Sequence, residues 1–141
     1  MRVCLDSSAL AKRYVAEIGS DRVAARCAGA DEVILSVLCL PELVSAFNRL
    51  RRERRLSAKR YRRFKRDLAS DVAQAVVIDV TPAVIERSIR CLEAMPLRAL
   101  DALHLACALE SRCELFLTAD ARQAEAARAF KLTVETVGNA Q

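Results

Sequence analysis

The chain has 141 residues, of which 53% are hydrophobic and 29% charged, so it is long enough for one domain with a sizeable core and is unlike a disordered chain. No apolar run approaches the length of a membrane span, and the N-terminus lacks a long apolar stretch of the secretory kind, so we expect a cytoplasmic protein without membrane contact. The net charge of +5 is unevenly distributed, because residues 49–66 carry +10 and the remainder −5. This distribution predicts a polyanionic substrate or an acidic partner.

Short runs rich in Val, Leu and Ile alternate with stretches of helical periodicity along the chain. The predicted strands are 2–5, 33–37, 76–80, 115–119 and 132–137. The predicted helices are 8–16, 20–29, 40–55, 58–73, 82–94, 98–112 and 121–130, with Ser20, Ser57 and Thr81 as N-caps. Strands separated by helices predict a parallel sheet covered on both faces, so we expect a three-layer α/β/α fold in a single domain over residues 1–141.

Two consecutive helices between the second and third strands form a predicted helical hairpin that turns at Leu56-Ser57. The segment of high positive charge lies on this hairpin. We interpret most of its arginines as a solvated face, but the density of charge predicts an anionic contact. The candidates for contact with nucleic acid or a protein partner are Arg62, Arg63 and Arg66.

Three acidic residues lie where predicted strands end. Asp6 directly follows the first strand, Asp120 follows the fourth, and Glu42 lies in the first turn of the helix after the second. Ligands of an open parallel sheet bind beyond the carboxyl ends of its strands, where the strand order reverses. Asp79 also lies near a strand end, but if the third strand is at the edge of the sheet, Asp79 is remote from that point and is not a candidate.

Asp101 reaches the same edge by a longer route. From Asp101 to Cys113 the helix descends about 18 Å at 1.5 Å per residue. From Glu114 to Asp120 the chain climbs about 20 Å at 3.3 Å per residue. The two distances nearly cancel, so Asp101 is predicted to lie beside Asp120 and the other two acids.

Four carboxylates at one point repel one another and raise one another's pKa values, a conflict that a divalent cation removes. A single histidine and six cysteines without a C-x-x-C pair do not suit zinc, whereas oxygen ligands suit Mg²⁺ or Mn²⁺. Such an ion beside a basic hairpin predicts phosphodiester hydrolysis of a nucleic acid. Each acid alone also fits a structural role at a helix start, and the joint placement of the four favours the metal site.

Polar neighbours of the acids have smaller predicted roles. Ser7 is interpreted as a cap of the first helix, and Ser8 as a cap or a contact of bound water. Thr118 either positions a phosphate or simply suits a strand, and Arg98 is placed to clamp phosphate. His104 is interpreted as a packed, hydrogen-bonded side chain rather than a catalytic base.

Four segments resemble, in this order, sequence blocks of the PIN-domain family, and especially of VapC-type toxins from toxin–antitoxin pairs: "LDSSALAKRY", "PELVSAF", "LRALDALHLA" and "LTAD". The resemblance implies a Mg²⁺- or Mn²⁺-dependent endoribonuclease with a five-stranded parallel sheet of order 3-2-1-4-5. Its acidic cluster and strand-end hydroxyl fall on Asp6, Glu42, Asp101, Asp120 and Thr118. It also implies a homodimer, a cognate antitoxin that docks on the hairpin and the active-site groove, and operator DNA bound only through the antitoxin complex.

The chain departs from the family pattern around Phe130-Lys131, where a glycine common before the last strand is replaced. A haloacid-dehalogenase-like phosphatase would need an aspartate in place of Ser8, and a P-loop nucleotidase would need a G-x-x-x-x-G-K motif that the chain lacks. Two alternatives stay open. They are a structure-specific DNA nuclease and a non-catalytic PIN-like module that binds RNA or protein.

Overall fold

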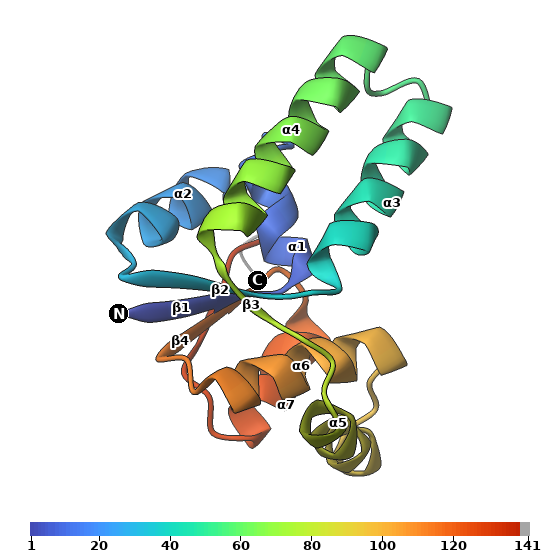
Figure 1. Cartoon of the computed structure of the whole chain (residues 1–141). Helices are drawn as coiled ribbons and strands as arrows, with labels where there is room; N and C mark the ends of the chain where they lie inside the picture. Colours follow the sequence, from blue (N-terminus) through green and yellow to red (C-terminus); the bar gives the residue numbers. More distant parts are fainter. Residues whose placement is uncertain (139–141) are drawn as a thin grey trace.

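The structure is a computed structural model and describes residues 1–138 (Figure 1). The strands are β1 (Arg2–Leu5), β2 (Glu32–Ser36), β3 (Val76–Ile78), β4 (Leu115–Thr118) and β5 (Val134–Thr136). They form one parallel sheet in the order β3-β2-β1-β4-β5, as the resemblance implied. Leu5 of the central strand pairs with Leu35 on one side and Leu117 on the other. The strand order therefore reverses between β1 and β4.

Helices cover both faces of the sheet (Figure 1). On one face lie α1 (Ser7–Leu10), α2 (Ser20–Gly29), α3 (Cys39–Arg52) and α4 (Ala58–Gln74). On the other lie α6 (Ala99–Ser111) and α7 (Ala121–Ala129), with α5 (Pro82–Ala94) packed against α6. None of the helices in the described part of the chain is long and apolar enough to span a bilayer. The predicted α/β/α class is confirmed.

Alternate residues of β1 pack into different cores. Val3 and Leu5 belong to the core under α1–α4, Cys4 belongs to the core under α6 and α7, and each is at most 2% exposed. A strand buried on both faces needs an apolar residue at nearly every position. The apolar run of β1 ends at Asp6, and that of β4 ends at Thr118, so polar side chains emerge at the same edge of the sheet.

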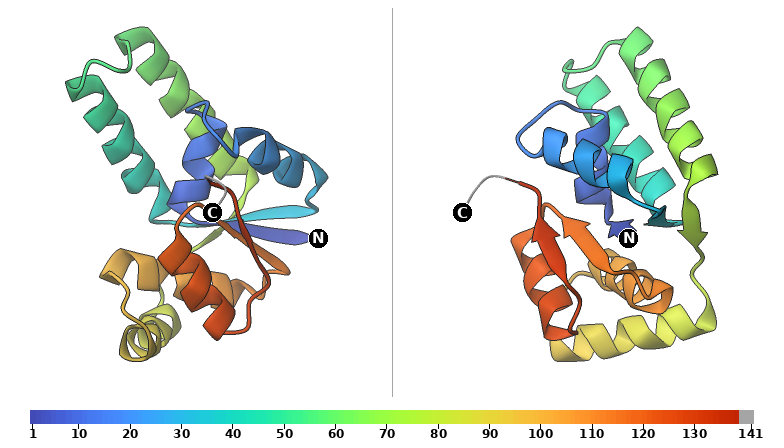
Figure 2. Two further views of the ribbon diagram at one scale, coloured as in Figure 1. Left: turned by 180° about the vertical axis from the view of Figure 1, so that it is seen from behind. Right: turned by 90° about the vertical axis from the view of Figure 1, so that its left-hand side faces the viewer.

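The predicted hairpin is formed by α3 and α4, which project beyond the sheet (Figures 1 and 2). Phe47 of α3 and Phe64 of α4 are at most 4% exposed, and their ring centroids lie 5.4 Å apart. Tyr14 packs on Phe47 with a centroid distance of 5.8 Å. Because the aromatic faces pack inward, the basic residues of both helices are left on the outside.

The first helix is shorter than predicted. Instead of running over 8–16 it ends at Leu10 and continues as a 3₁₀ turn over Ala11–Arg13. Lys12 explains the change, because its buried ammonium donates a 2.7 Å hydrogen bond to the Ile18 carbonyl oxygen and draws the following chain into a loop. The other predicted elements are present, with their ends shifted by up to three residues.

Two of the three predicted N-caps are confirmed. Ser57 and Thr81 accept hydrogen bonds from the first turns of α4 and α5. Ser20 is not the cap of α2, because Gly19 occupies that position with a φ of +96°. A side chain at Gly19 would place its Cβ 2.5 Å from the Val137 carbonyl oxygen, so this position requires glycine for both its conformation and its space.

Candidate active site

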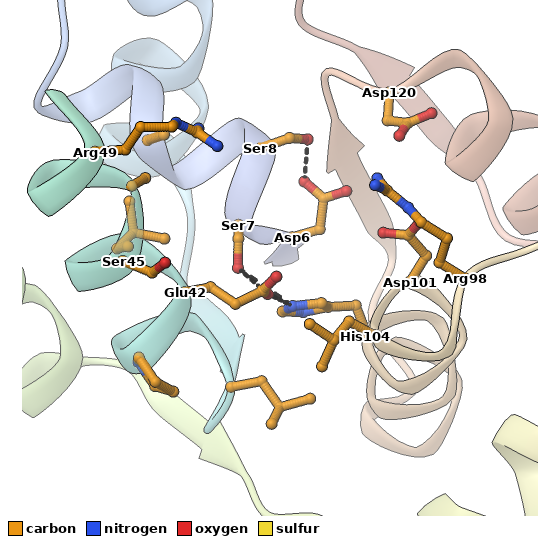
Figure 3. A pocket seen from close by; sticks show the side chains of 16 residues that line it. Asp6, Ser7, Ser8, Glu42, Ser45, Arg49, Arg98, Asp101, His104 and Asp120 are labelled. Atoms are coloured by element: carbon orange, nitrogen blue, oxygen red, sulfur yellow. Dashed lines mark hydrogen bonds and ion pairs between the residues drawn. The ribbon is translucent and has the colours of Figure 1, made fainter. Parts of the chain in front are cut away.

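The four predicted acids line one cavity of about 670 Å³ at the carboxyl ends of β1 and β4 (Figure 3). They come from four separate segments, and Asp101 reaches this edge as the helix and strand lengths predict. Asp6 follows β1, Glu42 lies in the first turn of α3, Asp101 lies in the first turn of α6, and Asp120 follows β4. Asp79 does not line this cavity.

The remaining predicted site residues divide into two groups. Ser8 and Arg98 line the cavity, and Thr118 contacts Asp6 directly. Arg62, Arg63 and Arg66 lie outside the cavity, on α4 of the hairpin.

Asp6 is a buried carboxylate, with 5% of its surface exposed. It is the N-cap of α1, and its Oδ1 accepts a 3.0 Å hydrogen bond from the Ala9 N–H, so the structural role considered for it is present. Ser8 also donates to Oδ1, at 2.6 Å, and Thr118 donates to Oδ2 at 2.5 Å. Burial raises the pKa of Asp6, and these three hydrogen bonds oppose the rise.

Backbone groups orient the two hydroxyls that hold Asp6. Ser8 Oγ accepts from the Ala119 N–H at 2.9 Å, and Thr118 Oγ1 accepts from the Asp120 N–H at 3.1 Å. A hydroxyl has one proton, and these contacts leave it free to point at the carboxylate. In this structure Ser8 and Thr118 therefore act as positioning residues for Asp6.

Glu42, His104 and Ser7 form a second polar group in the cavity (Figure 3). His104 Nε2 is paired with Glu42 Oε1, and Ser7 Oγ donates to the same oxygen at 2.7 Å and lies 3.2 Å from Nε2. The prediction of Ser7 as the helix cap is wrong, because Asp6 already accepts the hydrogen bond from that turn. The sequence signal for this group was weak, since the spacing between Glu42 and His104 has no local pattern.

His104 is 4% exposed, which confirms the prediction of a packed, hydrogen-bonded histidine. Burial alone would lower its pKa, but hydrogen bonds with Cys39 and Glu42 raise the pKa to about 10. The contact with His104 in turn lowers the pKa of Glu42. At neutral pH the two side chains are therefore an imidazolium–carboxylate pair, and the imidazole has no free lone pair with which to act as a base.

Asp101 and Asp120 are held at neighbouring helix starts. Arg98 Nε donates to Asp101 Oδ2 at 3.3 Å. Asp120 caps α7, where its Oδ1 accepts from the backbone N–H groups of Arg122 and Gln123 at 2.8 and 3.3 Å. The amide of Gln123, which is 1% exposed, donates to the Asp101 carbonyl oxygen at 2.8 Å and so ties α6 to α7. Gln123 was not predicted, since one polar residue among several in an Ala-rich helix gives no such signal.

The donor chemistry of the cavity suits Mg²⁺ or Mn²⁺, because its acidic groups are all carboxylates and a cation would stabilise the charged form of buried Asp6. Within residues 1–138, however, no three acidic, histidine or cysteine side chains converge closely enough to hold one ion. The expected mutual rise in pKa is also absent for Glu42, whose pKa is lowered by His104. The contacts with His104 and Arg98 occupy Glu42 Oε1 and Asp101 Oδ2, so the second oxygen of each carboxylate would be the one to face an ion.

The sequence matches the profile of the PIN-domain family over residues 3–129, and no curated protein matches it significantly. The fold is similar to VapBC2 from Rickettsia felis bound to a promoter DNA fragment, with a TM-score of 0.69 and 13% identity over 96% of this chain and 98% of that one. FitAcB from Neisseria gonorrhoeae has a TM-score of 0.68 and 17% identity, over 94% of this chain and 95% of that one. VapC20 from Mycobacterium tuberculosis, a sarcin-ricin loop cleaving toxin, has a TM-score of 0.66 and 18% identity, over 88% of this chain and 94% of that one. On the strength of the profile match, which covers most of its length, the chain is a member of the PIN-domain family.

Proposed function

We propose that this protein is a Mg²⁺- or Mn²⁺-dependent endoribonuclease, the toxin of a VapBC-type toxin–antitoxin pair, and that it acts in the cytoplasm. The observation that carries the proposal is the cavity, which is lined by carboxylates from four separate segments and lies next to a hairpin rich in Arg and Lys. If each acid served only to stabilise the start of its own helix, there would be no reason for all four to line the same cavity. Membership of the PIN-domain family and the similarity of fold to VapC20 support the same function.

The ion would be held by Asp6, Glu42, Asp101 and Asp120. When bound, it would polarise a phosphate oxygen and lower the pKa of a water molecule. The hydroxyls of Ser8 and Thr118 keep the Asp6 carboxylate oriented in the cavity.

Two cationic side chains have separate roles in this proposal. The protonated imidazole of His104 orients Glu42, which would help to hold the ion, and does not accept a proton. Arg98 lies at the mouth of the cavity, with its side chain 82% exposed, where its guanidinium is able to reach a phosphate.

We further propose a cognate antitoxin that docks on the hairpin and the cavity, a homodimer, and contact with operator DNA only through the antitoxin complex. Two observations support an anionic or acidic partner on the hairpin. Its outer surface is strongly basic, and only one of its basic residues, Arg55, forms an ion pair within residues 1–138. VapBC2 from Rickettsia felis, whose fold is similar to that of this chain, is bound to a promoter DNA fragment, and this supports the proposed contact with operator DNA.

Cleavage of a mixed cellular RNA pool by the purified protein tests the proposal. We expect discrete fragments with Mg²⁺ or Mn²⁺ and intact RNA with EDTA. The Asp101→Asn variant should leave the RNA intact under all three conditions, and it is the preferred control because Asp101 caps no helix through its side chain. Intact RNA with the folded wild-type protein and either metal would refute the proposal and favour the binding module, whereas cleavage of structured DNA alone would favour the DNA nuclease.

A further inference from the structure

Two arginines line the cavity, and their surroundings differ (Figure 3). Arg98 lies on the wall formed by α6 and is paired with Asp101. Arg49 lies on the opposite wall, formed by α3, and forms no ion pair with any carboxylate in the described residues 1–138. Its side chain is exposed, and no side chain among residues 1–138 forms a hydrogen bond with it that would explain its position through folding. Arg49 is thus a cation available to a ligand that enters the cavity.

The position of Arg49 on α3 places it on the same side as the acidic group. Glu42, Ser45 and Arg49 all line the cavity and are separated by three and four residues, which is the spacing of one face of a helix. Arg49 lies seven residues after Glu42, about 10 Å along the helix axis. Side chains of an α-helix lean toward its N-terminus, so the guanidinium leans toward the acids.

The separation indicates what Arg49 contacts. A guanidinium presents a planar fork of N–H donors that matches the oxygens of a phosphate. Because Arg49 lies about 10 Å along α3 from Glu42, its position suits a phosphate next to the cleaved bond better than the phosphate under attack. We propose that Arg49 binds a backbone phosphate of the RNA that flanks the cleaved bond, so that the strand runs from the acids along α3 toward the hairpin. This inference rests on the proposed function and adds the path of the substrate.

Steady-state cleavage of a short oligoribonucleotide that contains the site cut by the wild-type protein provides the first test. We expect Arg49→Gln to lower kcat/KM about tenfold, mainly through KM, because binding to a flanking phosphate is the same in the ground and transition states. Arg49→Lys should recover part of the loss, since it keeps the charge without the fork. Arg128→Gln is the matched control, because Arg128 is exposed at the end of α7, away from the proposed path of the RNA, and does not line the cavity. Equal effects of the Arg49 and Arg128 replacements would overturn the inference.

A second test removes the phosphate charge instead. A set of the same oligoribonucleotides, each with one uncharged methylphosphonate linkage, would be cleaved by wild type and by Arg49→Gln. We expect one linkage beside the cut at which neutralisation slows the wild type but does not slow the variant further, because both changes remove the same contact. Additive losses at every linkage would overturn the inference.

The two proposals fail in different ways. Absence of cleavage by the wild type would remove the proposed function itself. Normal wild-type cleavage with additive losses would remove only the role of Arg49. Unchanged cleavage by Arg49→Gln combined with weaker binding of an antitoxin would assign Arg49 to the protein partner instead.

Discussion

Thr118 Oγ1 donates a 2.5 Å hydrogen bond to Asp6 Oδ2, and this contact joins two residues that are 112 positions apart in the sequence. They lie at the carboxyl ends of β1 and β4, the two strands between which the strand order reverses. The bond belongs both to the fold and to the site, because it satisfies a buried carboxylate and aims it into the cavity. Its loss should therefore be visible in stability as well as in activity.

Thr118→Val is expected to lower the free energy of unfolding by about 1–3 kcal/mol, because a buried carboxylate oxygen and the Asp120 N–H each lose a hydrogen-bond partner. Valine suits a strand, so the backbone should not change. Urea denaturation at pH 7 measures the effect. Thr136→Val is the matched control, since Thr136 is exposed and is the register partner of Thr118 on β5. If Thr136→Val lowers the free energy of unfolding as much as Thr118→Val does, the hydroxyl contact with Asp6 is not the cause.

Glu42→Gln is expected to lower the pKa of His104, which is about 10 in the wild type, because burial of the imidazolium is then no longer offset by a carboxylate. The chain has one histidine, so its NMR titration in EDTA reports this side chain without assignment ambiguity. Glu110→Gln is a control that removes an acid at the other end of α6. A wild-type pKa near 6.5 would contradict the ion pair.

The same pair makes stability depend on pH. The pKa of Glu42 is lowered in the folded state, so its contribution is present above about 4.5 and is lost as the pH falls. The pKa of His104 is raised, so its contribution is complete below 6.5 and is lost as the pH rises toward about 10. The difference in unfolding free energy between wild type and Glu42→Gln should therefore be larger at pH 5.5 than at pH 9. Equal differences at the two pH values would argue against a protonated His104.

Asp101→Asn is expected to abolish RNA cleavage while changing the free energy of unfolding by no more than about 0.5 kcal/mol, or to raise it. In the part of the chain that the structure describes, this side chain caps no helix and pairs only with a highly exposed arginine, so its charge is not needed for folding. Its removal also relieves repulsion between carboxylates. Cleavage assays and urea denaturation on the same preparation measure both effects. Asp79→Asn, at an exposed acid outside the cavity, should keep full activity. An unfolded Asp101→Asn protein would indicate a structural role instead.

Replacement of Arg62, Arg63 and Arg66 by Gln is expected to weaken RNA binding and to flatten its salt dependence. If each contacts one phosphate, the slope of log K against log salt should decrease in magnitude by about 2, at roughly 0.7 per phosphate of a single strand. Binding would be measured with Asp101→Asn as the background, so that the RNA stays intact.

The control for the hairpin is an equal loss of charge on the opposite face of the sheet. Arg90, Arg128 and Lys131 are exposed there, on α5 and at the end of α7, and their replacement by Gln should leave the salt slope unchanged. A similar decrease from both triple variants would assign the effect to net charge rather than to the hairpin.

The fold could be predicted because its signals are local. Apolar runs such as those around Cys4 and Phe116 reveal strands that are buried on both faces, and Pro82 after Thr81 marks a helix start. The position of Asp101 followed from the lengths of one helix and one strand alone. The end of the first helix was predicted wrongly because Lys12 is buried, and a lysine gives no sign of this in the sequence.

The details of the site depend on contacts between distant segments, so sequence patterns could not supply them. Glu42 and His104 are paired across 62 positions, and Ser7 joins them although its place in the sequence suggested a helix cap. Arg49 could be seen as part of a charged segment, but only the folded structure shows that it lines the cavity and that the other arginines of the hairpin do not.

The position of β4 after the other segments of the site affects the timing of activity during synthesis. A nascent polypeptide that has not passed residue 120 lacks Asp120, and it also lacks the Thr118 hydroxyl that orients Asp6. On the proposed function, such a fragment would not cleave RNA. The proposed nuclease would become active only after synthesis has passed residue 120, and a message interrupted before β4 would yield an inactive product.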